Sequence, residues 1–397
     1  MSPKSYAMKI FVLLPRIPYP LEKGDKLRAF NQIKQLAKHN EIVLCALNDD
    51  RKVSEQDAFR ALQPYCQSIS FIRITKPQIL LGLVCAFLKG LPMQCGYFYN
   101  RKAVKKIDAL IAKHKPDMLF GQLLRVAEYI RHKDLPKAID YQDIFSYGMK
   151  RRADIASFVT RPVYNMEYRR LCRYEAAIFD DFDVKTIISE PDRSLFPHEK
   201  RDEILIVPNG VDHEKYHPMD CEKQYDLVFT GNMSYPPNVN AVDYLANDIL
   251  PIVWKTLPEV KLYIAGATPD PKVKKAASER IIVSGWLDDI RDAYAQSRVF
   301  IAPMRIGTGL QNKLLEAMSM RLPAITSPLA NASLGANPNE EILIGSNAEE
   351  MAQNIITLLT DKAKAERIAQ AGFDFTNRVY DWGKATEVLE EAMNRAL

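Results

Sequence analysis

Residues 298–328 read RVFIAPMRIGTGLQNKLLEAMSMRLPAITSP, an order of apolar run, glycine loop, helix and second apolar run. Gly307 and Gly309 permit positive φ angles and a close approach of a ligand to the backbone. The stretch therefore predicts a strand, a loop that approaches a ligand, a helix and a second strand.

The start of this helix brings together backbone amides and two charged side chains. The amides of Leu310, Gln311 and Asn312 would point toward an anion at the helix N-terminus. Lys313 and Glu316 are three residues apart and therefore share one helix face. A lysine there can neutralise a diphosphate, while the carboxylate binds both ribose hydroxyls through charge-assisted hydrogen bonds. The pattern predicts a pocket for a nucleoside diphosphate; an exposed ion pair between the two side chains is the alternative.

The composition is that of an ordinary globular protein. The chain has 397 residues, of which 47% are hydrophobic and 26% charged, and this length favours two domains. Its six cysteines show no C-x-x-C spacing, which suits free thiols in a reducing cytoplasm. We find no signal-peptide core and no run of about 20 apolar residues that could cross a bilayer. We therefore expect a cytoplasmic protein, either free or peripheral at the inner face of the cell membrane.

The small net charge of +5 is concentrated in one window. Residues 149–174 contain seven bases, Arg151 and Arg152 among them, against two acids. The alternatives are a solvated helical face, a site for an anionic acceptor such as a lipid-linked phosphate, or contact with an acidic membrane surface. Nucleic acid is not expected, because the window lacks the alternation of basic and aromatic residues found in stacking platforms.

Short apolar runs alternate with helical patterns along the whole chain, as in buried parallel strands with crossover helices. The first series lies at residues 10–14, 42–47, 69–74, 118–121, 138–141, 184–189 and 204–207. The second series lies at residues 226–230, 261–266, 281–285, 299–303, 324–327 and 342–345. The fold class is therefore α/β, with two doubly wound Rossmann-like domains.

We place the N-terminal domain at residues 1–206, joined by a C-terminal helix at 377–397, and the second domain at residues 207–376. Ligands of open parallel sheets bind at the carboxyl ends of the strands, so the two domains would face a central cleft. Gly24 and Asp25 stand at the start of the first crossover helix. We expect them to approach the ligand from the opposite side to the loop before Lys313.

Four other patterns resemble functional motifs, but we interpret them as structural. The sequence H-E-K-Y-H at 213–217 has the spacing of a zinc site, but Pro218 disfavours a helix there. Asp181-Phe182-Asp183 is interpreted as a solvated loop, and no metal is expected. The loop at 307–312 lacks the third glycine and the later acid of a dinucleotide-binding motif. Leu80, Leu83, Val84, Phe87 and Leu88 have helical spacing and are interpreted as core residues, with membrane contact as the alternative.

These motifs together resemble the retaining glycosyltransferases of family 4, which have the GT-B fold, and in particular a bacterial branch that assembles polysaccharides. The most specific match is GLQNKLLEAMSMRLPAITSP, similar to the glycine-rich loop, LEAMA helix and following strand of that family. IVPNGVD at 206–212 resembles its linker, and KTIISEPD at 185–192 its strand followed by Ser-Glu. The opening RIPYPLEKGDKLRAFNQIKQLAK resembles a branch in which the loop at Gly24 and Asp25 faces the donor phosphates.

The resemblance implies that donor-binding residues occupy corresponding loops of the second domain. The second glutamate of the family's Glu, seven residues, Glu motif holds the donor ribose and matches Glu316. The first glutamate of that motif is replaced by Thr308. The loop TGNMSYPPNVN, with Gly231 and Asn232, lacks the usual Arg and Lys pair. Trp286 has two alternative roles: its ring stacks on the nucleobase, or it packs against neighbouring side chains of the protein.

The departures from the family pattern bear on catalysis. Arg305 and Lys313 would replace the missing cation pair at the leaving diphosphate, where anion stabilisation has the largest effect on the rate. The family's usual histidine is also absent, and Gln142 or Asp143 stands near its place. Asp143 is the candidate base if a side chain takes the acceptor proton.

The implied reaction is transfer of a sugar from a nucleoside diphosphate to a glycan or lipid-linked acceptor, with retained anomeric configuration. We expect no cofactor and no metal, and the partners are the nucleotide sugar, the acceptor and an anionic membrane surface. Two alternatives keep the fold: a catalytically silent protein that binds nucleotide sugar, and a nucleotide-sugar epimerase.

Overall fold

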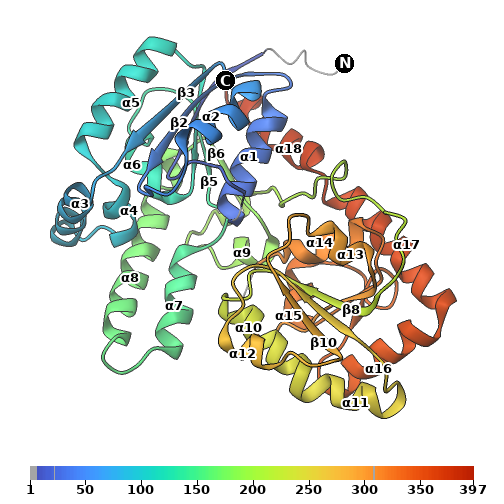
Figure 1. The fold of residues 1–397 in the computed structure, drawn as a ribbon. Coiled ribbons are helices and arrows are strands. Elements are labelled where there is room, and N and C mark those ends of the chain that lie inside the picture. The colour runs from blue at the N-terminus through green and yellow to red at the C-terminus, as the bar shows by residue number, and fades with distance from the viewer. Residues whose placement is uncertain (1–6, 22, 307–308) are drawn as a thin grey trace. The chain divides into compact units, whose positions relative to one another are not determined.

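The computed structural model describes residues 7–21, 23–306 and 309–397, and the chain forms two compact units (Figure 1). Unit 1 comprises Met1–Pro208 and Trp382–Leu397, and unit 2 comprises Asn209–Asp381. Each unit has its own parallel β-sheet covered by helices.

The sheet of unit 1 has seven strands in the order β3-β2-β1-β4-β5-β6-β7. Their bounds are β1 Lys9–Leu14, β2 Glu41–Asn48, β3 Ser68–Arg73, β4 Met118–Gln122, β5 Lys137–Asp140, β6 Val184–Ile187 and β7 Leu205–Ile206. The sheet of unit 2 has six strands in the order β10-β9-β8-β11-β12-β13. Their bounds are β8 Tyr225–Thr230, β9 Leu262–Ala265, β10 Ile281–Gly285, β11 Ser297–Ala302, β12 Ala324–Thr326 and β13 Leu343–Ile344. Every apolar run predicted from the sequence is a strand, and the doubly wound α/β fold is confirmed.

Most helices connect successive strands. Those of unit 1 are α1 Gly24–Leu36, α2 Glu55–Leu62, α3 Lys76–Lys89, α4 Met93–Phe98, α5 Arg101–His114, α6 Ala127–Ile130, α7 Phe145–Ile155, α8 Arg161–Ala177, α9 Glu190–Ser194 and the C-terminal α18 Trp382–Ala396. Those of unit 2 are α10 Pro236–Tyr244, α11 Leu250–Thr256, α12 Pro271–Lys275, α13 Arg291–Ala295, α14 Asn312–Ser319, α15 Pro328–Leu334, α16 Ala348–Thr360 and α17 Lys362–Val379. Helices α16, α17 and α18 follow the last strand.

Both faces of the unit 1 sheet are buried, which explains why its strands are apolar without interruption. In β1, Phe11 and Leu13 belong to one core cluster, whereas Ile10, Val12 and Leu14 belong to the other. This alternation follows the two-residue period of a strand. A strand buried on both faces gains free energy from every side chain, so a run of branched and aromatic residues is favoured.

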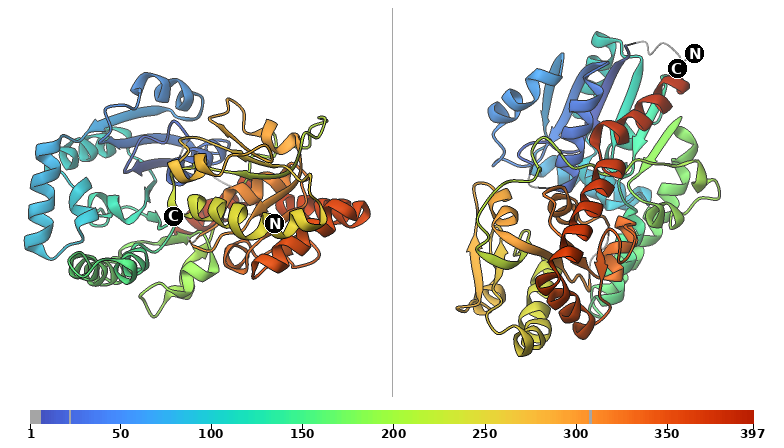
Figure 2. Two further views of the ribbon diagram at one scale, coloured as in Figure 1. Left: turned by 60° about the horizontal axis from the view of Figure 1, so that its bottom comes forward. Right: turned by 90° about the vertical axis from the view of Figure 1, so that its right-hand side faces the viewer.

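The last helix, α18, packs against the first helix, α1, of the same unit (Figure 2). Glu390 of α18 accepts a hydrogen bond from the side-chain amide of Asn40 at 2.8 Å and lies 3.2 Å from the His39 ring. Leu389 and Met393 are fully buried in the core beside β1. Unit 1 is therefore built from both ends of the described chain.

Helix α3 contradicts the interpretation of its apolar stripe as core. Leu80, Val84, Phe87 and Leu88 are exposed, and Leu83 is half-buried. The buried side of the helix is instead made of small residues, because a β-carbon on Gly82 would lie 2.2 Å from the carbonyl oxygen of Gly96 in α4. The two helices approach so closely that only small residues fit between them, and the large side chains point outward.

A fully buried ion pair links α1 to the centre of the unit 1 sheet. The Arg28 guanidinium donates to the Asp140 carboxylate at the end of β5, with Nε–Oδ2 and Nη2–Oδ1 distances of 2.6 and 3.1 Å. Asp140 also accepts from Gln32 of α1 at 3.2 Å and from the Thr186 hydroxyl of β6 at 3.0 Å. A buried charge is tolerated only when its partners satisfy it in this way.

We predict that Asp140→Asn lowers the free energy of unfolding by about 3–5 kcal/mol, because the buried Arg28 guanidinium loses its ion pair with the Asp140 carboxylate. Urea denaturation followed by circular dichroism measures this change. Asp108→Asn is the matched control, since Asp108 pairs with Lys133 at the surface of the same unit and such a pair contributes about 1 kcal/mol or less. Equal losses in the two variants would contradict the prediction.

Candidate functional site

The candidate site of unit 2 lies where the strand order of its sheet reverses. From β8 the chain proceeds outward through β9 to β10, and it then returns to place β11 on the other side of β8. The loops after β8 and β11 therefore begin at neighbouring strand ends, which is where open α/β sheets bind ligands. The β11 loop leads into α14, which carries Lys313 and Glu316.

Lys313 points back toward the end of β8. Its ammonium group donates to Asn238 Oδ1 of α10 at 2.6 Å and lies 4.2 Å from the centre of the Phe229 ring. Burial of this group lowers the pKa of Lys313 to about 7, and the nearby Glu316 acts in the opposite direction. With such a pKa, about half of the Lys313 side chains are unprotonated near physiological pH. An anion bound beside the lysine would favour the protonated, charged form.

Glu316 is held by a different partner. Its Oε2 accepts a hydrogen bond from the Tyr294 hydroxyl at 2.7 Å, and that hydroxyl lies 2.8 Å from Thr230 Oγ1 at the end of β8. Burial raises the pKa of the Glu316 carboxyl, and the hydrogen bond from Tyr294 opposes this rise. Within the described part of the chain Lys313 and Glu316 form no ion pair with each other, so the alternative of a simple surface pair does not describe them.

Two glycines allow the loops after β8 and β9 to approach each other. Gly231 and Gly266 have φ angles of 145° and 149°. A β-carbon on Gly266 would lie 1.7 Å from the Gly231 carbonyl oxygen, and one on Gly231 would lie 3.0 Å from the Lys313 ammonium nitrogen. Asn232 organises the same loop, because its Oδ1 accepts from Ser234 N at 3.0 Å and from Thr268 Oγ1 at 2.9 Å.

The glycine loop before α14 is only partly described. Gly307 and Thr308 lie outside the described residues. Gly309 has a φ of 83°, and its carbonyl accepts from the Gln311 side chain at 3.2 Å. Leu310 is half-buried, and α14 begins at Asn312. The loop thus has the left-handed glycine conformation that the sequence predicts at this position.

Arg305 and Trp286 lie on exposed parts of unit 2. Arg305 donates to Asn240 Oδ1 at 3.2 Å and its guanidinium lies 4.0 Å from the Tyr244 ring centre. Both partners belong to α10, the helix that also supplies Asn238 to Lys313. Trp286 follows β10 and is 67% exposed, so its ring has no core role. The packing alternative for Trp286 is therefore wrong.

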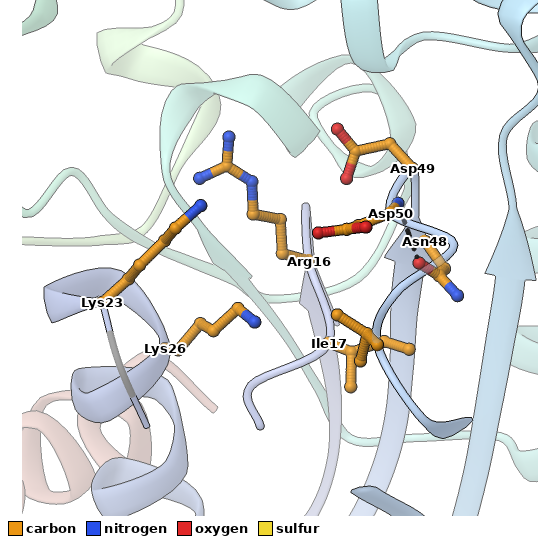
Figure 3. Close-up of a pocket in the computed structure, with 8 residues that line it drawn as sticks. Arg16, Ile17, Lys23, Lys26, Asn48, Asp49 and Asp50 are labelled. Atoms are coloured by element: carbon orange, nitrogen blue, oxygen red, sulfur yellow. Dashed lines mark hydrogen bonds between the residues drawn. The ribbon is translucent and has the colours of Figure 1, made fainter. Parts of the chain in front are cut away.

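In unit 1 the residues at the start of α1 border a cavity of about 200 Å³ (Figure 3). Figure 3 shows Arg16, Lys23 and Lys26 on one side and Asp49 and Asp50 on the other.

Next to this cavity Gly24 starts α1, and the Asp25 carboxylate lies 3.1 Å from Arg16 Nη1. Asp25 also accepts from the backbone N of Lys26 at 3.0 Å. The carboxylates of Asp25, Asp49 and Asp50 therefore balance the three cations beside the cavity, Arg16, Lys23 and Lys26. Their hydrogen-bond donors and acceptors suit a ligand rich in hydroxyl groups.

Asp143 stands in the loop after β5, one residue beyond Gln142, whose φ is 64°. Surrounding protein atoms raise the pKa of Asp143 to about 6, and Asp192 acts in the same direction while Arg125 and Arg151 oppose it. The side chain is exposed to water, and solvent screening therefore limits the shift.

Arg151, on α7, lies 4.8 Å from the Tyr147 ring centre and contributes to the field at Asp143. Arg152 is exposed on the same helix. Of the two arginines, the structure therefore associates Arg151 with Asp143.

Residues 7–21, 23–306 and 309–397 contain no group of three or more His, Cys, Asp or Glu side chains arranged to hold a metal ion. Over the same residues, no helix has the length and apolar character needed to span a bilayer.

The second unit matches a known family, and the whole chain matches known structures. Residues 224–361 match the family model of the glycosyl transferases group 1. HepE of Anabaena, solved in complex with UDP, covers 98% of this chain and 100% of its own, with a TM-score of 0.70 at 13% identity. The fold is GT-B. The GT-B fold confirms the prediction of two Rossmann-like domains.

Two bacterial proteins are similar to this chain in sequence. An uncharacterized 44.6 kDa protein in the cps region of Klebsiella pneumoniae is 23% identical over 396 residues, or 94% of this chain and 96% of that protein. A galactosyltransferase of Escherichia coli, UDP-Gal:alpha-D-GlcNAc-diphosphoundecaprenol alpha-1,3-galactosyltransferase, is 29% identical over 181 residues, or 40% of this chain and 45% of that protein. Residues 224–361 therefore resemble the group 1 glycosyl transferases, and the whole chain shares the GT-B fold.

Sequence reasoning missed the residues that orient the two charged groups of α14. Asn238 and Tyr294 are 75 and 22 residues away from their partners along the chain. Asn238 belongs to the stretch TGNMSYPPNVN, which lacks the family's cation pair, and it lies in the first turn of α10. Its amide was the available signal, because an amide after a strand end can orient a lysine that has no acidic partner.

We predict that the affinity for a nucleoside diphosphate sugar falls as the pH rises above 7. Lys313 is protonated below its pKa of about 7, and the bound anion raises that pKa, so binding above pH 7 requires uptake of a proton. Calorimetric titration between pH 6 and 8.5 measures the loss, which approaches about tenfold per pH unit.

The control for this pH dependence is Lys313→Arg, whose guanidinium stays charged over the whole range and should give a flat profile. Lys272→Met, which removes an exposed lysine of α12, should keep the wild-type profile. An affinity of the wild type that does not change with pH would contradict the prediction.

Proposed function

We propose that this protein is a retaining glycosyltransferase of family 4, which moves a sugar from a nucleoside diphosphate to a glycan or lipid-linked acceptor during polysaccharide or glycolipid biosynthesis. The observation that carries the proposal is the arrangement on α14. A lysine with a lowered pKa and a glutamate oriented by Tyr294 meet at the switch point of a domain that matches the group 1 glycosyl transferases.

The donor is proposed to bind along the loops after β8 and β11. Lys313 would carry the negative charge of the leaving diphosphate, with Arg305 and the backbone of Gly309–Asn312 beside it. Glu316, oriented by the Tyr294 hydroxyl, would accept hydrogen bonds from the two ribose hydroxyls. Gly231 leaves space beside the lysine where a side chain would crowd the ammonium group. Trp286 is proposed to stack on the nucleobase, since its ring is exposed at a strand end.

The chemical step breaks the bond between the anomeric carbon and the diphosphate and forms a bond from that carbon to an acceptor oxygen on the same face of the sugar. The acceptor hydroxyl loses its proton, and an oxygen of the leaving diphosphate takes it up in a front-face route. Asp143 is the side-chain alternative, because a carboxylate with a raised pKa accepts a proton more readily. Neither a metal nor a cofactor is part of the proposed step.

The acceptor is proposed to be lipid-linked, with the Escherichia coli relative acting on GlcNAc-diphosphoundecaprenol. On the acceptor side the proposal assigns Arg151, near Asp143. Gly24 and Asp25 remain the residues proposed to face the donor phosphates, as the resemblance implies. The donor nucleotide is proposed to be a uridine diphosphate, because HepE was solved with UDP and the relative uses UDP-Gal.

The test is to incubate the purified protein with UDP-galactose, UDP-glucose or UDP-N-acetylglucosamine and measure UDP release with and without GlcNAc-diphosphoundecaprenol. We expect one donor to release UDP faster with acceptor present and to give an α-linked product, visible in the anomeric coupling constant. Binding without any release would support a silent nucleotide-sugar protein instead. Interconversion of free UDP-sugars would support an epimerase, and a β-linked product would contradict retention.

We predict that Glu316→Ala weakens donor binding on the order of tenfold or more, because two charge-assisted hydrogen bonds to the ribose are lost. Titration with UDP measures the affinity, and the melting temperature without ligand checks that the variant is folded. Glu366→Ala, an exposed carboxylate of α17, is the matched control and should bind as the wild type does. Unchanged affinity in Glu316→Ala would remove this residue from the donor site.

A further inference from the structure

The outward face of α3 exposes more large apolar side chains than a surface helix normally does. It consists of Leu80, Leu81, Val84, Phe87 and Leu88, which are 64, 65, 48, 53 and 78% exposed. We call these five residues the α3 face. The close packing of Gly82 on Gly96 fixes which side of the helix is buried, so the face cannot rotate inward. A contiguous apolar face of this kind marks a surface that another body covers.

A second exposed apolar group lies at the turn between α7 and α8. Phe158 and Val159 in the turn are 93 and 81% exposed, and Val163 in the first turn of α8 is 60% exposed. Helices α7 and α8 form a hairpin that extends from unit 1 and carries these residues at its tip (Figure 1). We call them the hairpin tip.

Arginines line the side of α8 that continues from this tip. A groove of about 470 Å³ is bordered by Phe158, Arg161, Arg169, Arg170 and Arg173 together with polar and apolar neighbours, and no acid borders it. Within the described residues Arg169 and Arg173, both exposed, take part in no ion pair. The two acids of α8, Glu167 and Glu175, are both buried, and Glu167 accepts from the backbone amides of Met93 and Gln94 at the start of α4.

Arg170 joins α8 to the α3 face. Its Nη2 donates to the Phe87 carbonyl at 3.2 Å, and its guanidinium lies 4.9 Å from the centre of the Phe87 ring. Nη1 reaches the Leu91 carbonyl, just beyond α3, at 3.4 Å. The apolar face and the arginine groove are therefore parts of one surface of unit 1.

We propose that this surface docks unit 1 onto an anionic lipid bilayer, with the α3 face and the hairpin tip entering the acyl boundary and the α8 arginines binding the headgroup phosphates. Exposed aliphatic and aromatic side chains next to bases are the combination that holds a protein in the interfacial plane of a bilayer. Charge complementarity selects the lipid surface over a second copy of the chain, because a two-fold contact through this surface would bring the arginine grooves of both copies together.

From the sequence we expected a protein that is either free or peripheral at the inner face of the cell membrane. The proposal assigns this membrane association to α3 and α8. Arg151 and Arg152, for which the sequence left an acceptor site or a membrane contact open, lie on α7 and are not among the residues that border the groove. Docking of this kind is separate from sugar transfer, because it needs neither donor nor acceptor. Its failure and the failure of the proposed reaction are therefore distinguishable.

The test is flotation of the full chain with vesicles of phosphatidylcholine alone or with about one third phosphatidylglycerol. We expect the wild type to float with the anionic vesicles and not with the neutral ones. Leu81→Glu combined with Leu88→Glu should lower the bound fraction on the order of tenfold at any salt concentration, because carboxylates cannot enter the acyl boundary. Arg169→Glu combined with Arg173→Glu should lower it at low salt and remove the dependence on salt.

Matched controls come from α2 of the same unit, where Phe59 is 43% exposed and Arg60 is also exposed. Phe59→Ser and Arg60→Glu should bind vesicles as the wild type does, whereas Phe87→Ser should bind more weakly. Melting temperatures equal to that of the wild type show that the variants are folded. Equal flotation of the wild type and the Leu81/Leu88 variant would overturn the proposal, as would a wild-type dimer in sedimentation that this variant converts to a monomer.

Discussion

The buried ion pair of Arg28 and Asp140 is the constraint on which unit 1 depends. Asp140 ends β5 and accepts from α1 and β6, so one carboxylate fixes the first helix against the middle of the sheet. Its backbone carbonyl also accepts from Leu123 in the loop after β4. The loop that carries Arg16, the first turn of α1 with Asp25 and the loop that carries Asp143 are thereby held at the same sheet edge, and Asp25 and Asp143 are candidate site residues of unit 1.

Among the described residues of unit 2, no buried ion pair comparable to that of Arg28 and Asp140 links a helix to the sheet. Lys313 and Glu316 are each held by a neutral side chain, Asn238 and Tyr294. Neutral partners orient an ionisable group without supplying its counter-charge, so a bound ligand can supply that charge. This difference separates a charge pair that stabilises a fold from charged groups arranged for binding.

The sequence was sufficient to predict every strand and the α/β class, because strands buried on both faces are continuous apolar runs. It also located Lys313 and Glu316 on one helix face. It did not show their partners, since Asn238 and Tyr294 come close only through the strand order. It misassigned the stripe on α3, because helical spacing shows which residues share a face and not which face is covered. The small residues Gly82 and Gly96 decided that question.

The return of α18 to α1 has a consequence for biosynthesis of the chain. Residues 382–396 leave the ribosome after all of unit 2, yet Leu389 and Met393 complete the core beside β1. During translation the apolar surface that they cover stays open while unit 2 can already fold. Unit 1 is therefore finished last although its first strand is made first, and its exposed core in that interval is a natural substrate for chaperones.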